Sequence, residues 1–182
     1  MRLVPTLRAG SGPGLRQSGF TLLELIGVVC IVAVMIGVLL NRLQVYKEVA
    51  EKASMQQTAA AIKSALQMRV AAYMISGQEN EIESLANKNP VGLLQEAPGN
   101  YAGEFFADAY ARVPPGSWYY DLTRKELVYV IQLGDNFKPG ADGRKWVRYR
   151  VRLGYEDMPL QGGTRKVFSA VSLAPVQPLV WF

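Results

Sequence analysis

Hydrophobic positions follow three different patterns along this chain. From Phe20 to Leu40 the residues are almost all apolar, and Glu24 is the one charged side chain. From Arg42 to Ser76 the chain is rich in Ala, Gln, Lys, Glu and Met, and larger apolar residues recur every three or four positions. From Ser117 onward, apolar and polar residues alternate. In that order, the patterns predict an apolar helix, an amphipathic continuation of it and a β-sheet.

The apolar run is long enough to cross a membrane. About twenty residues rising 1.5 Å each span a hydrocarbon core of roughly 30 Å. A secretory signal peptide, the first alternative, has a shorter apolar region of about 7–15 residues and ends in small residues. This run ends in Leu39-Leu40-Asn41-Arg42 instead. The second alternative, a plain anchor, gives no reason for Glu24, since a carboxylate in the membrane costs at least about 2.5 kcal/mol.

The residues around the start of this run resemble a known family. The string Gly19-Phe20-Thr21-Leu22-Leu23-Glu24 follows a basic leader and precedes an apolar helix, as in the precursors of type IV pilin-like proteins. That family includes major and minor type IV pilins and the pseudopilins of type II secretion. The resemblance implies that a prepilin peptidase cuts between Gly19 and Phe20 and methylates Phe20. It also implies that Glu24 meets the N-terminal amine of a neighbouring subunit during filament assembly.

The expected leader, residues 1–19, contains three arginines and no acidic residue. Positive charge on one side of a membrane helix keeps that side in the cytoplasm. We therefore expect a single-pass protein of the bacterial inner membrane, with a cytoplasmic N-terminus and a periplasmic head, that enters a filament after assembly. Removing the leader lowers the formal charge from +5 to +2. The high isoelectric point is thus weak evidence for a nucleic-acid partner, and we do not expect one.

The pattern divides the rest of the chain into a helix and a head. We predict a transmembrane and assembly helix over 20–41 and its amphipathic continuation over 42–76, which together form one helix of about 55 residues. The head-facing stripe of the second half is Ile62, Leu66, Val70 and Tyr73. Gly77 is expected to end the helix. Related helices often have a proline where this chain has Asn41.

Residues 77–116 form the least regular part of the sequence, and we predict a variable connecting loop there. Pro98-Gly99 and Pro114-Pro115-Gly116 bracket residues 100–113. Within that stretch the spacing of the apolar residues predicts a short helix around Phe105, Phe106, Ala109 and Tyr110.

Residues 117–182 are predicted to form an antiparallel β head of about four strands. Period-two alternation marks the runs 118–121, 126–133, 145–153 and 165–174. Short turns join these runs, which is typical of an antiparallel meander. We expect one face of the sheet to pack on the helix stripe, giving a pilin-like α+β fold.

One strand of the predicted sheet has a basic face. Trp146, Arg148, Arg150 and Arg152 share this face, opposite the apolar residues of the same strand. Arginines beside an aromatic residue can contact a phosphate backbone, and some pilin-like proteins take part in DNA uptake. The alternatives are a solvated strand face or contact with acidic residues of the next subunit. Like charges along a strand also discourage edge-to-edge pairing of sheets.

Other candidate chemistry is sparse. Asp135 and Asp142 are weak candidates for calcium binding, because oxygen-rich loops suit that cation, but turn-forming residues explain them equally well. The sequence contains no histidine and one cysteine, Cys30. An intramolecular disulfide is therefore impossible, although many pilin heads use one to hold a C-terminal loop. Packing, or an ion, must hold this head together. We expect no cofactor and no catalytic activity.

The function that these observations predict is structural. We expect a subunit, minor rather than major, of a type IV pilus or a type II secretion pseudopilus. Its partners would be the prepilin peptidase, other pilin or pseudopilin subunits and the inner membrane. The alternative is a minor pilin whose basic strand face binds DNA or a surface. The sequence does not separate pilus from pseudopilus.

Overall fold

The computed structural model describes residues 20–160 and 163–182. The predicted leader, including Gly19 of the cleavage site, lies outside the described residues. The chain divides into two compact units, with the boundary between Arg42 and Leu43. The first unit contains the N-terminal part of helix α1 (Leu22–Ile75), and the second contains the remainder of α1 and the head.

Helix α1 is 54 residues long, which confirms the predicted long helix. Its C-terminal end is closed by a Schellman motif around Gly77, which has a φ of +68°. The amide of Gln78 donates to the carbonyl of Tyr73 at 2.8 Å, and the amide of Gly77 donates to the carbonyl of Met74 at 3.3 Å. Only glycine adopts this left-handed conformation without a steric cost, so Gly77 ends the helix where the sequence predicts.

The head is an α+β structure, as predicted, with a sheet that is larger than expected. Three short 3₁₀ helices follow α1, and the sheet then contains five strands in the order β1-β2-β3-β4-β5. Strands β2 to β5 form the predicted antiparallel meander, whereas β1 pairs with β2 in parallel. The elements are η1 (Glu79–Glu81), η2 (Glu83–Asn87), η3 (Pro90–Leu93), β1 (Tyr101–Phe105), β2 (Trp118–Asp121), β3 (Glu126–Val130), β4 (Trp146–Leu160) and β5 (Gly163–Pro175).

The prediction of a short helix within residues 100–113 is wrong. Residues Tyr101–Phe105 form the edge strand β1, and only a single turn follows, in which the amide of Val113 donates to the carbonyl of Ala109. Apolar residues spaced three and four apart suggested a helix, but Phe105 belongs to strand β1 and Ala109 follows it in the turn, and both pack in the same cluster on one face of the sheet. Tertiary pairing with β2 decides the conformation here.

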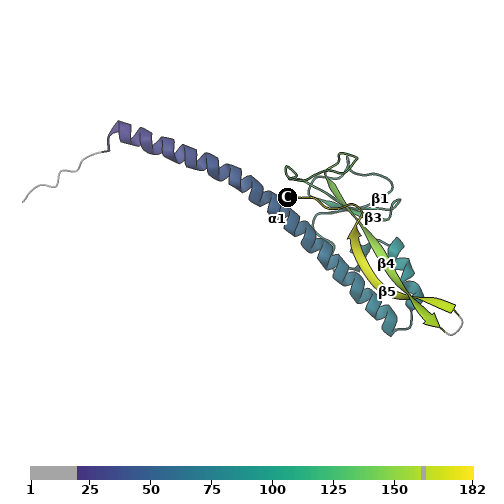
Figure 1. Ribbon diagram of the computed structural model, residues 1–182. Coiled ribbons are helices and arrows are strands. Elements are labelled where there is room, and N and C mark those ends of the chain that lie inside the picture. The colour runs from purple at the N-terminus through teal and green to yellow at the C-terminus, as the bar shows by residue number, and fades with distance from the viewer. Residues whose placement is uncertain (1–19, 161–162) are drawn as a thin grey trace, which may run out of the picture. The chain divides into compact units, whose positions relative to one another are not determined.

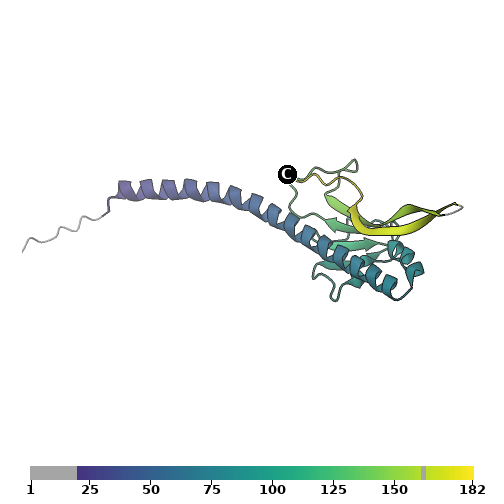
Figure 2. The same cartoon turned by 60° about the horizontal axis from the view of Figure 1, so that its bottom comes forward.

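The larger hydrophobic core lies between the sheet and the second half of α1 (Figures 1 and 2). The predicted helix stripe contributes Ile62, Leu66 and Val70, which are all buried, while Tyr73 packs at the margin. The opposing strands contribute the alternate residues expected from the period-two pattern. These are Trp118, Tyr120, Leu127, Tyr129, Val147, Tyr149 and Val151.

A second, smaller core covers the opposite face of the sheet. It consists of residues from the segment after β1 and from the outward positions of β2, β3 and β4: Ala109, Val113, Tyr119, Val128, Val130 and Trp146, with Phe105 and Tyr110 packed against them. The sheet therefore has apolar packing on both faces. The alternation in the sequence predicted one buried face, because it gave no sign that residues 105–113 fold back over the other.

Candidate functional site

The N-terminal end of α1 carries the residues that the sequence singled out for assembly. Thr21 caps the helix, since its Oγ1 accepts a hydrogen bond of 3.2 Å from the backbone amide of Glu24. A threonine followed three residues later by a glutamate is a capping-box sequence, and an acidic residue in the first turn also interacts favourably with the helix dipole. Thr21 thus has a capping role that the sequence analysis did not assign, although the Thr-x-x-Glu pattern signals it, and Glu24 is the acidic residue of the first turn.

From Phe20 to Leu40 the first unit presents an apolar surface on which Glu24 is the one charged side chain. The side chains described between Phe20 and Leu40 are all exposed within the chain, Phe20 and Cys30 among them. This part of α1 is long and apolar enough to cross a membrane. An apolar helix surface of this length needs lipid or other protein around it, because exposure to water is unfavourable.

Two carboxylates on the second half of α1 hold the loop that follows β3. Glu51 accepts hydrogen bonds of 2.7 Å from the amides of Gln132 and Leu133, and a third from the hydroxyl of Tyr129 at 3.0 Å. One turn earlier, Glu48 is 3% exposed and accepts hydrogen bonds from the backbone and the side chain of Asn136 at 2.9 and 2.7 Å. The helix therefore supplies the acceptors that the loop backbone needs.

Glu48 also holds the C-terminal segment. It accepts a hydrogen bond of 2.8 Å from the indole nitrogen of Trp181, which is 2% exposed. Beside it, the ammonium group of Lys52 donates to the carbonyl of Trp181 at 2.6 Å and lies 5.4 Å from the ring centroid of Phe182. Trp181 in turn stacks edge-on against Phe137. We call Glu48, Glu51 and Lys52 the helix clamp.

The environment of Glu48 favours its ionised form. Burial by itself raises the pKa of a carboxyl group, but the hydrogen bonds from Asn136 and Trp181 outweigh burial, and the charge of Lys145 adds to their effect. The pKa of Glu48 is consequently lowered from its ordinary value of 4.5. The clamp is thus built around a carboxylate at neutral pH.

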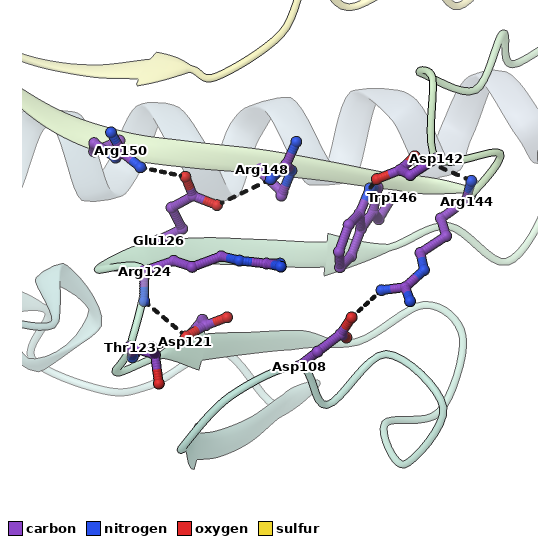
Figure 3. A network of polar contacts seen from close by, with 10 residues as sticks. All are labelled: Asp108, Asp121, Thr123, Arg124, Glu126, Asp142, Arg144, Trp146, Arg148 and Arg150. Atoms are coloured by element: carbon purple, nitrogen blue, oxygen red, sulfur yellow. Dashed lines mark hydrogen bonds and ion pairs between the residues drawn. The ribbon is translucent and has the colours of Figure 1, made fainter.

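Two residues of the predicted basic strand face, Arg148 and Arg150, form ion pairs within the chain. Glu126 on β3 is 2% exposed, and its two carboxylate oxygens face Arg150 at 2.6 Å and Arg148 at 3.5 Å (Figure 3). Arg152, the next residue on this face, is exposed and has no ion pair among the described residues. Two of the three arginines of the predicted face therefore contact Glu126.

Trp146 is not an exposed aromatic residue on that face. It is 5% exposed, its indole nitrogen donates to Asp142 at 3.0 Å, and Arg148 lies 5.0 Å from its ring centroid. The guanidinium of Arg144 stacks on the same ring and forms an ion pair with Asp108 (Figure 3). These contacts fasten the 105–113 segment over the sheet. A buried tryptophan is therefore not available as a stacking platform for bases.

The two weak calcium candidates lie in different surroundings. Both residues are exposed, but Asp142 accepts hydrogen bonds from the indole nitrogen of Trp146 and the amide of Arg144. Within residues 20–160 and 163–182, no group of three or more histidine, cysteine or acidic side chains is placed to hold a metal ion. The hydrogen bonds of Asp142 fit the turn-forming role that the sequence offered as the alternative.

Comparison of the chain with protein-family models, curated proteins and solved structures found no match.

Proposed function

We propose that this chain is a membrane-anchored structural subunit of a type IV pilin-like assembly, a type IV pilus or a type II secretion pseudopilus. The proposal places the protein in the bacterial inner membrane with a periplasmic head, and it makes a minor subunit the most suitable role. The resemblance at Gly19–Glu24 motivates the proposal. Its main support is that the apolar segment with a single carboxylate and the segment buried against the sheet belong to one helix, α1.

The proposed mechanism depends on Glu24. After cleavage between Gly19 and Phe20, the new amino group lies four residues before the carboxylate. In a filament, the amine of one subunit would neutralise Glu24 of another, and apolar burial between helices would replace contact with lipid. Because an unpaired carboxylate is costly there, this pairing would also set the axial register between subunits.

The first experiment tests processing. The full chain is produced together with a prepilin peptidase, and the mature protein is analysed by N-terminal sequencing and mass spectrometry. We expect a methylated Phe20 at the N-terminus, and we expect Gly19→Ala to leave more precursor. A mature protein that still begins within residues 1–19 contradicts the proposal.

The second experiment separates pairing from helix capping. Glu24→Val removes the carboxylate, while Thr21→Val removes the side chain that caps the helix and leaves Glu24 in place. We expect both variants to insert into the membrane, and only Glu24→Val to be absent from sheared filaments. Normal incorporation of Glu24→Val rules out the assembly role, and equal defects in both variants would mean that the intact first helical turn, not the carboxylate in particular, is what assembly needs.

The alternative, binding of DNA or a surface through the basic strand face, has less support. It needs Arg148 and Arg150 free to contact a ligand, and both face the buried carboxylate of Glu126.

A further inference from the structure

The two edges of the sheet differ in how well they are protected against pairing. Strand β1 is a short edge: it has five residues, a register irregularity between Tyr101 and Glu104, and Gly103 at a φ of +106°. Short length, irregular register and a charged residue are the features by which proteins block sheet edges. Strand β5 forms the other edge and has 13 residues.

The middle of β5 lacks such protection. Arg165 and Lys166 stand near its start and Pro175 at its end, and the eight residues between them, 167–174, include no charge and no proline. One bulge occurs, since Ala170 pairs with Gly154 and Phe168 with Tyr155, which leaves Ser169 without a partner. A regular, uncharged edge therefore remains over Ala170–Ala174.

The outer backbone groups of this edge have no partner within the described part of the chain. The backbone of Ala170–Ala174 bonds to β4 on one side. Outside the strand ladders, no backbone hydrogen bond of the described residues involves 170–174, and the next one along the chain is donated by the amide of Val176 to the carbonyl of Arg148. In an antiparallel ladder, half of the amide and carbonyl groups of an edge strand point away from the sheet. Figure 2 shows β5 along the border of the sheet. An extended strand is the partner that such a row of donors and acceptors fits.

The sequence of the edge is complementary to itself in antiparallel register. With Ser172 at the centre, Ser172 faces its own copy, Ala170 faces Ala174, and Val171 faces Leu173. Opposite residues of antiparallel strands lie on the same face, so small side chains meet small ones and apolar ones meet apolar ones. Val171 and Leu173 are 7% and 9% exposed and belong to the core under the sheet, which the second copy would extend.

No charge opposes a like charge in this register. The basic pair Arg165 and Lys166 would lie beyond Pro175 of the other strand, opposite Leu179 and Pro178. A groove of about 320 Å³ lies beside the start of this edge, between Val70, Ala71 and Met74 of α1 and Ala170 and Val171 of β5.

We propose that β5 is a docking edge for β5 of a second copy of this chain, paired antiparallel about a two-fold axis at Ser172. Such a contact is isologous and closed, so it gives a dimer and does not propagate into a filament. It therefore concerns a state of the subunit other than the filament, and it does not depend on the proposed function. Glu24→Val should leave the dimer intact.

Cysteine crosslinking tests the axis directly. In the full chain carrying Cys30→Ser, Ser172→Cys places two thiols opposite each other across the axis, within the distance range of cross-strand pairs, about 4.5–5.5 Å between Cβ atoms. Thr164→Cys, exposed on the same strand, is the matched control. Under mild oxidation in membranes, we expect a covalent dimer from Ser172→Cys and none from Thr164→Cys. Equal crosslinking of both variants, or none of either, overturns the proposal.

A charge-reversal pair tests the register. Because Ala170 faces Ala174 of the other copy, Ala170→Lys/Ala174→Lys brings like charges together twice, whereas Ala170→Lys/Ala174→Glu makes two opposite pairs. Using Ser172→Cys crosslinking as the readout, we expect loss of the dimer in the first variant and its recovery in the second. Recovery also shows that the edge still folds with two charged residues. Equal crosslinking in both variants contradicts this register.

Discussion

Glu48 on helix α1 accepts a hydrogen bond of 2.8 Å from the indole of Trp181, a residue 133 positions later in the chain. Both side chains are buried, at 3% and 2% exposure. A single carboxylate therefore joins the helix, the loop at Asn136 and the C-terminal segment. In a head that cannot form an internal disulfide, this hydrogen-bonded clamp holds the segment after β5 in place.

Removing this carboxylate should destabilise the head. Glu48→Ala leaves the buried indole nitrogen of Trp181 without an acceptor, at a cost of about 1–3 kcal/mol, and also removes the acceptor of the two hydrogen bonds from Asn136. We expect a loss of roughly 2–4 kcal/mol in the free energy of unfolding, measured by urea titration of the full chain in mild detergent with tryptophan fluorescence as the signal. Glu48→Gln keeps one acceptor oxygen and should lose less. Glu96→Ala, at an exposed position, is the control, and an equal loss there argues against the clamp.

The same carboxylate should make stability depend on pH. The pKa of Glu48 is lowered in the folded chain, so the folded state holds its proton less tightly than the unfolded state does. The resulting stabilisation is fully present above the ordinary value of 4.5 and is lost as the pH falls through the folded pKa. In urea titrations at a series of acidic pH values, wild type should lose more stability than Glu48→Gln. Parallel curves for the two proteins contradict this prediction.

Replacing both arginines that pair with Glu126 should reduce the free energy of unfolding by more than the sum of the two single replacements. Arg148→Met/Arg150→Met leaves a carboxylate with 3% side-chain exposure uncompensated, and breaking a buried pair in this way costs about 3–5 kcal/mol. Each single change leaves one arginine facing Glu126 and should cost less than half as much. Arg152→Met should stay within about 0.5 kcal/mol of wild type, as expected for a surface position. Urea midpoints of the four variants give the comparison, and additive single effects would mean that the arginines act independently.

A side chain at Gly77 should lower the free energy of unfolding by straining the end of α1. Gly77→Ala places a Cβ on a backbone with a φ of +68°, although no atom lies within 4 Å of the new methyl group. The cost is therefore backbone strain alone, about 1–2 kcal/mol, read from the thermal or urea unfolding of the full chain. Gly92→Ala, which also meets no neighbour and has no positive φ, is the matched control. Equal effects of the two substitutions contradict the assignment of Gly77 as the helix stop.

Much of the head architecture was predictable because it depends on local periodicity. The three- and four-residue spacing of Ile62, Leu66 and Val70 defines a helix face whatever packs on it, and the alternation through β3 and β4 defines strand faces in the same way. Gly77 was predictable as well, since the conformation that it adopts is costly for any other residue.

Other features depend on residues far apart in the chain. Strand β1 exists because β2 pairs with it, and Trp146 is buried because residues 105–113 fold over the outer face of the sheet. The helix clamp joins Glu48 to positions 88 and 133 residues away. Nothing in the local pattern around Glu48 distinguishes it from the exposed acids elsewhere on the chain.

The sequence by itself determined the apolar N-terminal helix, its amphipathic continuation and the α+β class, because these follow from the periodicity of neighbouring side chains. It also carried the resemblance at Gly19–Glu24 on which the proposed function depends. Only the tertiary structure decided that Arg148 and Arg150 form ion pairs with Glu126, that Glu48 holds the C-terminal segment, and that β5 is an open edge. Those outcomes depend on which distant groups satisfy each buried donor and acceptor, and the order of residues alone does not specify that pairing.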